Sequence, residues 1–174
     1  MKRLLFRCVL WAARLPLQKV YSRTYQAGEK SIVNRVTIIG PIRFRECIAH
    51  ALDLLSAQDP AGNSLVQRYI MAVVASNQNE EVAFVIKVAY IAANDDGLMG
   101  WPPSRIAAYL VRMAVYVRLL DNNVCYARND RARSLACRNE LRALRLLECS
   151  TEYIHEQEEH LRAVSPCQIP PGKP

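Results

Sequence analysis

The chain has 174 residues, of which 51% are hydrophobic and 22% charged, with only six glycines and nine prolines. This length predicts one compact domain rather than a multidomain protein, and the composition excludes a disordered or fibrous protein. The net charge of +7 is concentrated at the N-terminus, because the first 50 residues hold ten Lys or Arg and two acids.

The N-terminal segment, residues 1–28, is basic and holds no acid. On a helix, Arg3, Arg7 and Arg14 share one face while Trp11 and several leucines share the other. The apolar run falls short of the ~20 residues that span a bilayer. We therefore expect either a membrane-binding segment, with these three arginines and Trp11 at an anionic lipid surface, or a packed first helix. The expected location is the cytoplasm or the periphery of the inner membrane.

The next four segments are predicted to be a strand, a helix, a turn and a second helix. Residues 31–40 are β-branched and alternating, which predicts one strand. Residues 44–56 carry an apolar stripe that repeats every three or four positions, which predicts a helix. Residues 59–63, DPAGN, predict a turn, and residues 65–74 predict a second amphipathic helix.

A further strand is predicted over 82–92, where β-branched and aromatic residues alternate. A helix is predicted over 104–120, opened by two prolines. Its only charged residues are Arg105, Arg112 and Arg118. A helix with so little charge predicts the central, most buried element of the fold.

Two more helices are predicted, over about 130–149 and 151–164, followed by a Pro-rich tail at 165–174. The expected fold class is therefore α+β, mostly helical, with a small sheet. We expect a single domain over 29–164.

No catalytic constellation is intact. His155 and His160 lie five positions apart, which turns their side chains ~140° away from each other on a helix, whereas a metal-binding pair lies four apart. His50 is the only other histidine, and the glycines do not form a phosphate loop. We predict no cofactor, no metal ion and no small-molecule substrate.

Nucleic acid is not an expected partner, although several arginines lie between 128 and 145. They recur at several angles of a helix, as on a solvated face. Aromatic residues make up only 7% of the chain and do not alternate with the basic ones.

The order of segments RVTIIG, RECIAHALDLLSAQDP, SLVQRYIMAVVAS, EVAFVIKVAYIA, SRIAAYLVRMAVYVRLL and RARSLACRNELRALRLL, over about 33–164, resembles a small bacterial family of gluzincin-type zinc metallopeptidases. In that family one helix carries a pattern close to LVHEATHARL. A later helix carries a glutamate within RxExxCxxxExxF. The resemblance implies a minimal zincin-like domain with a central buried helix.

The corresponding helix here reads LVRMAVYVRL, residues 110–119. By this resemblance Arg112 replaces the first zinc histidine, Met113 the general-base glutamate and Tyr116 the second histidine. Glu140 is what remains of the distal glutamate. Catalysis in this class needs two imidazoles, a carboxylate and a base around zinc, so we expect no peptidase activity. An Arg112–Glu140 ion pair is expected to link the two helices in place of the metal.

The resemblance thus implies a catalytically inactive, metallopeptidase-like protein, a pseudo-peptidase that binds a protein or peptide partner through the old substrate cleft. The alternative is a peripheral membrane accessory protein held at an anionic membrane surface by its basic N-terminal helix.

Overall fold

The computed structural model of the chain describes residues 28–76, 81–83, 87–92, 100–122, 124 and 129–165, with 19, 22, 23 and 26 described singly. The predicted membrane-binding residues Arg3, Arg7, Trp11 and Arg14 lie outside this part of the chain, as does the tail beyond Ser165. Within the described residues, no helix combines the length and the apolar character that a membrane span requires.

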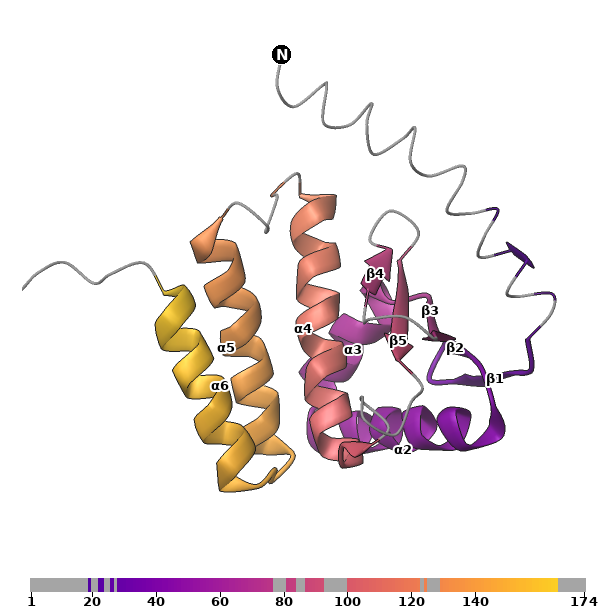
Figure 1. The fold of residues 1–174 in the computed structure, drawn as a ribbon, viewed down its shortest axis with the longest axis horizontal. Coiled ribbons are helices and arrows are strands. Elements are labelled where there is room, and N and C mark those ends of the chain that lie inside the picture. The colour runs from indigo at the N-terminus through magenta and orange to yellow at the C-terminus, as the bar shows by residue number, and fades with distance from the viewer. Residues whose placement is uncertain are drawn as a thin grey trace, which may run out of the picture.

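The fold is mostly helical α+β, as predicted (Figure 1). The described helices are α2 (Ile42–Gln58), α3 (Pro60–Tyr69), α4 (Pro103–Asp121), α5 (Asp130–Leu146) and α6 (Thr151–Val164). The strands are β1 (Lys30–Val33), β2 (Val36–Ile39), β3 (Ala72–Ser76), β4 (Glu81–Ala83) and β5 (Val88–Ala92).

The strands form one small sheet in the order β1-β2-β3-β5-β4. β2, β3 and β5 run parallel in the middle, and β1 and β4 pair antiparallel at the two edges. Helices α2 and α3 supply the long connection that the parallel β2–β3 pair requires.

Two predicted strands are in fact hairpins. The single strand expected over 31–40 is divided into β1 and β2 by Asn34 and Arg35, whose φ angles are 49° and 69°. The strand expected over 82–92 is divided into β4 and β5, and Lys87 before β5 has a φ of 57°. Tight hairpin turns need such positive φ values, which glycine usually supplies. The turn at Asn34 and Arg35 contains no glycine, so the sequence pattern gave no sign of it.

The turn predicted at 59–63 is absent, and the helix predicted over 65–74 is present only in its first half. Residues 59–63 do not form a turn, because Asp59 caps α3: its Oδ1 accepts a hydrogen bond from the Gly62 backbone N–H at 2.9 Å, and Pro60 is the first helical residue. Helix α3 then ends at Tyr69, and the residues that follow form β3. A short apolar strand buried on both faces does not alternate, so it resembles the end of a helix.

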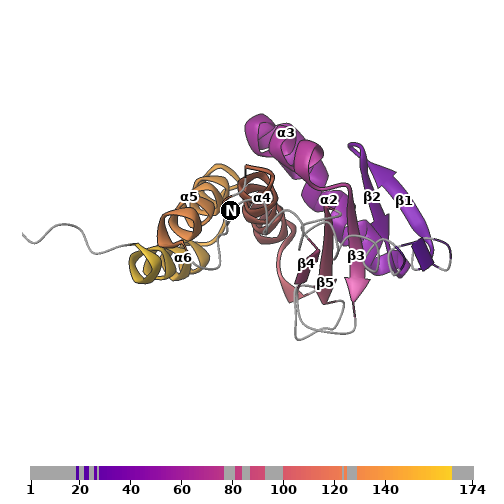
Figure 2. The same ribbon diagram turned by 90° about the horizontal axis from the view of Figure 1, so that it is seen from above.

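Helix α4 is the central, buried helix that its lack of charge predicts. It packs against α2 and α3 on one side and against α5 on another, and α6 packs on α5. Both ribbon views place α4 between the sheet and the α5–α6 pair (Figures 1 and 2). The helices predicted over 130–149 and 151–164 are α5 and α6.

Candidate functional site

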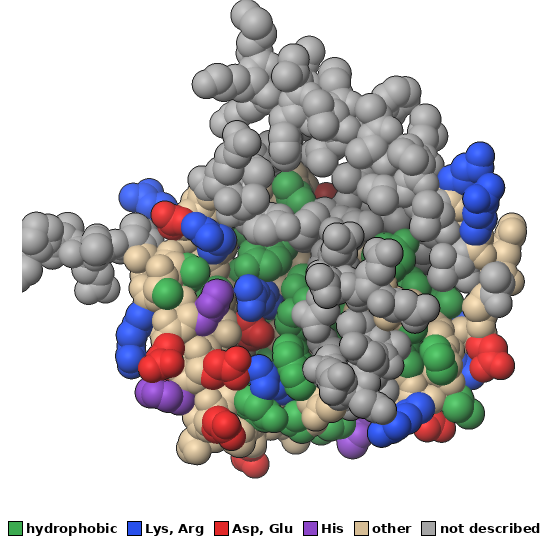
Figure 3. Space-filling view, in the orientation of Figure 1, with side chains coloured by type: hydrophobic (Ala, Val, Ile, Leu, Met, Phe, Trp, Pro, Cys, Tyr) green, Lys and Arg blue, Asp and Glu red, His purple; other side chains and the backbone are tan. Residues whose placement is uncertain are grey.

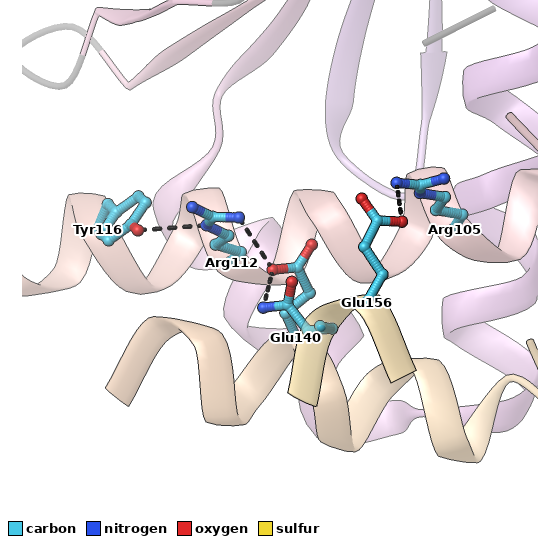
Figure 4. Close-up of polar contacts among 6 residues, drawn as sticks. Arg105, Arg112, Tyr116, Glu140 and Glu156 are labelled. Atoms are coloured by element: carbon cyan, nitrogen blue, oxygen red, sulfur yellow. Dashed lines mark hydrogen bonds and ion pairs between the residues drawn. The ribbon is translucent and has the colours of Figure 1, made fainter. Parts of the chain in front are cut away.

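Arg112 is the one charged residue in the buried stretch of helix α4, and its side chain is partly exposed. Each residue from 106 to 117 is buried except Arg112. Arg105 precedes it by seven residues, about two helical turns, so the two guanidinium groups lie on the same side of α4. That side faces α5 and α6 (Figure 4).

Arg112 joins three helices through a hydrogen-bonded cluster. Its Nη1 donates to Oε2 of Glu140 on α5 at 3.2 Å, and its Nε donates to the Tyr116 hydroxyl at 3.2 Å. The same Glu140 oxygen accepts a bond from Nε2 of Gln157 on α6 at 2.7 Å. The predicted contact between Arg112 and Glu140 is therefore present (Figure 4).

Burial controls the protonation of this cluster. The Glu140 side chain is only 9% exposed, and loss of solvent raises the pKa of its carboxyl to about 7 although the charge and hydrogen bond of Arg112 lower it. Arg112 stays protonated, since its pKa is raised by Glu140 and Tyr116 against the opposing effect of burial. Near neutral pH, Glu140 is thus present in both its charged and its neutral form.

Arg105 is held by aromatic rings. Its guanidinium lies 4.0 Å from the centre of the Trp101 ring and 4.1 Å from that of Tyr153 on α6. Its Nη2 donates to Oε2 of Glu156, also on α6, at 2.9 Å. Stacking between two rings and pairing with a carboxylate suit the flat guanidinium, so Arg105 fixes the start of α4 against α6.

A cavity of about 380 Å³ lies between these helices. Basic, acidic and histidine side chains gather on the face where α4 meets α5 and α6 (Figure 3). The groups that line the cavity include Arg105, Arg112, Glu140, Trp101, Tyr153 and His160. The cavity therefore offers charged groups of both signs beside aromatic walls.

The four positions assigned by the resemblance lie close together on α4 and α5. Met113 is buried and lines the cavity, and Tyr116 accepts a hydrogen bond from Arg112. Together with Glu140 they supply a thioether, a phenol, a guanidinium and one carboxylate. Zinc in proteins takes thiolates, imidazoles and carboxylates, so this set does not fit a zinc ion. Elsewhere in the described residues, no three His, Cys, Asp or Glu side chains gather as metal ligands.

The two histidines of α6 have separate surroundings, as their spacing predicts. His155 is exposed, and its Nε2 lies 3.4 Å from a carboxylate oxygen of Glu159. His160 lines the cavity instead. Burial, with the charges of Arg112 and Arg133, lowers the pKa of His160, so this imidazole is neutral at physiological pH.

The sequence patterns did not identify Trp101, Arg105, Tyr153 or Gln157 as site residues. The available signal was the seven-residue spacing of Arg105 and Arg112 on one face of α4. The other three come from a loop and from α6, and only the packing of the helices brings them to the cavity.

Comparison of the chain with models of protein families, with curated proteins and with solved structures finds no match.

Proposed function

We propose that this protein is a catalytically inactive, metallopeptidase-like protein that binds a peptide segment of a partner in the cavity between α4, α5 and α6. The proposal rests mainly on Arg112 and Glu140, which meet where the resemblance puts two zinc ligands. A guanidinium does not deprotonate in proteins, so a fixed positive charge occupies the place of the cation. Met113 in the place of the general base has no group that accepts a proton from water.

The sheet edge supports the choice of a peptide. β4 is the outermost strand on one side of the sheet and pairs antiparallel with β5. Both ribbon views draw it as the strand nearest to α4 (Figures 1 and 2). Extended peptides commonly bind to a protein by adding a strand to such an edge.

Metal analysis and a cleavage assay test the loss of catalysis. We expect the purified full chain to hold no stoichiometric zinc and to leave a mixed peptide library uncut. One tightly bound zinc ion per chain, or cleavage that a chelator stops, would refute the proposal.

A pair of histidine substitutions tests the binding role. We expect His160→Trp to fill the cavity mouth and reduce retention of library peptides by the immobilised chain at least about tenfold. His155→Trp is the matched control, because His155 is exposed on the same helix but does not line this cavity. Equal retention by the two variants would contradict binding in the cavity.

The second candidate function is a membrane-surface accessory protein, favoured by the basic, acid-free residues 1–28. Liposome flotation tests it. Binding that needs anionic lipid, weakens with salt and is lost on deletion of residues 1–15 would support this function. Equal flotation of the full and shortened chains would refute it.

A further inference from the structure

The Arg112 guanidinium has donors that the protein does not use. A guanidinium carries five N–H groups, and the bonds to Glu140 and Tyr116 use one on Nη1 and one on Nε. Nη2 has no hydrogen-bond partner among the described residues, and it is not one of their buried unpaired polar atoms. Because Arg112 lines the cavity with 23% of its side chain exposed, Nη2 is open to a ligand there.

The groups around Glu140 set the charge of the cavity. The titratable and charged groups beside Glu140 or along the same cavity are Arg105, Arg112 and Tyr116 of α4, Cys137 of α5, and Glu156 and His160 of α6. Burial raises the pKa of Tyr116 and of Cys137, so both stay neutral. Burial lowers the pKa of His160, which keeps this imidazole neutral at physiological pH. Two guanidiniums and two carboxylates remain, and the cavity becomes positive when Glu140 takes up a proton.

We propose that the cavity binds the carboxylate of an acidic peptide on Arg112, and that Glu140 takes up one proton from solvent when it binds. Two carboxylates that share one guanidinium at a partly buried site repel each other, so one of them is favoured in its neutral form. Glu140 is that one, because it is buried and the carboxylate of a peptide arrives from water already ionised.

The walls of the cavity favour a peptide over a small free acid. Trp101, Tyr109 and Tyr153 line it together with Leu144, so apolar side chains beside the acidic residue can be buried. Acidic peptides are thus the proposed ligand class, which rests on the peptide-binding function proposed above.

Proton uptake gives the binding a defined pH dependence. In the free protein the pKa of Glu140 is about 7, so the neutral form falls from about nine-tenths at pH ~6 to about one-tenth at pH ~8. The peptide glutamate stays ionised over this range. Affinity for the acidic peptide should therefore fall about tenfold between these two pH values.

The experiment uses two amidated hexapeptide libraries, one with Glu fixed at the third position and one with Gln there. Each is passed over the immobilised full chain at about pH 6 and about pH 8. We expect the Glu library to be retained about tenfold more strongly at the lower pH, and the Gln library to show no such change.

A free dicarboxylic acid added as competitor separates recognition of a bare carboxylate from recognition of a peptide. If it displaces the Glu library as well as an acidic peptide does, the peptide part of the proposal is overturned.

Three variants assign the effect to residues. Arg112→Gln should remove the preference for the Glu library, whereas Arg118→Gln, an exposed change on the same helix, should keep it. Glu140→Gln keeps the side-chain shape and cannot ionise, so its retention of the Glu library should be independent of pH and stay at the low-pH level. A purely structural role for Glu140 would not produce that result.

The outcomes separate the two proposals. If wild-type protein retains both libraries equally and His160→Trp reduces that retention, the carboxylate site is overturned and peptide binding stands. A Glu preference that the folded Arg112→Gln variant keeps, or that does not change with pH, also overturns the carboxylate site. If folded wild-type protein retains neither library, both the site and the peptide-binding function are wrong.

Discussion

At Glu140, burial and ion pairing act in opposite directions, and burial has the larger effect on the pKa. The carboxyl titrates at about 7 in the folded protein against 4.5 when unperturbed. Between these two values the folded chain holds a proton that the unfolded chain has lost, so stability decreases as pH rises. The stabilising contribution is complete below about pH 4.5 and is lost as pH rises through about 7.

Glu140→Gln tests this linkage. A raised pKa of this size corresponds to roughly 3 kcal/mol. Relative to wild type, the variant should therefore gain roughly 3 kcal/mol of unfolding free energy between about pH 4 and about pH 8. Urea denaturation at both pH values measures it. Glu152→Gln, an exposed change on α6, should follow the wild type. A Glu140→Gln variant that loses stability at the higher pH would show that the ion pair dominates.

The pairing itself is measured by a double-mutant cycle. Glu140→Leu alone leaves the Arg112 charge without its carboxylate. The loss of unfolding free energy should be smaller than the value of about 3 to 5 kcal/mol typical of a fully buried pair. Arg112 reaches the cavity and keeps its hydrogen bond to Tyr116. Adding Arg112→Met should recover most of the lost unfolding free energy, and the coupling energy between the two substitutions should be at least about 1 kcal/mol.

The exposed Arg145–Glu158 pair between α5 and α6 is the control for that cycle. Its two side chains are 58% and 30% exposed, so the same double substitution should give a coupling below about 1 kcal/mol. Coupling energies of equal size in the two cycles would contradict a special role for the buried pair.

At the scale of elements, the start of α3 depends on one buried carboxylate. Asp59 is 1% exposed. Its Oδ1 caps Gly62, and its Oδ2 accepts a bond from Nη2 of Arg142 on α5 at 2.8 Å. One side chain therefore fixes the first turn of α3 and attaches α3 to α5.

Asp59→Ala should cost about 2 to 3 kcal/mol of unfolding free energy, because the cap and the charged partner are lost together. Asp59→Asn should cost less, since an amide oxygen still caps the helix. Ser64→Ala, on the exposed face of α3, should stay within about 0.5 kcal/mol. Thermal or urea unfolding checks all three, and equal losses for Ala and Asn would show that the cap contributes nothing.

The helices could be predicted because each buries one face and therefore repeats its apolar residues. α2, α4, α5 and α6 all show that repeat, and their predicted bounds agree with the structure to within a few residues. The strands were harder. β3 is apolar on both sides and lacks any period, and the turns at Asn34, Arg35 and Lys87 adopt positive φ without glycine.

The candidate site was predictable only in part, for a similar reason. Arg112 and Glu140 were matched to positions of a known helix pattern, so their meeting could be anticipated. Trp101, Tyr153 and Gln157 contribute through tertiary packing of a loop and of α6, which leaves no local signal in the chain.

At the scale of the whole molecule, α4 and α6 differ in how they are held. Eleven residues of α4 are buried, whereas Gln157 is the one buried residue of α6. α6 is held by polar links to Arg105, Glu140 and Arg145 and by Ile154, which packs against the core while staying partly exposed. Segments with few buried apolar contacts open at lower free energy than the core.

Hydrogen-exchange mass spectrometry should therefore find α4 among the slowest-exchanging segments and α6 clearly faster. Arg105→Gln removes the stacked guanidinium and should speed exchange in α6 further without changing the buried middle of α4. Equal protection of the two helices, or an effect of Arg105→Gln confined to α4, would contradict this ranking.

The burial of α4 also has a consequence for how the chain folds as it is synthesised. α2 and α3 are made before α4, but α5, which covers another side of it, is completed only at Leu146. At roughly 5 to 20 residues per second, the ribosome needs on the order of seconds to add α5. For that time a helix with almost no charge presents an uncovered apolar side to the cell. The order of synthesis therefore leaves α4 without its α5 cover until the later helix has emerged.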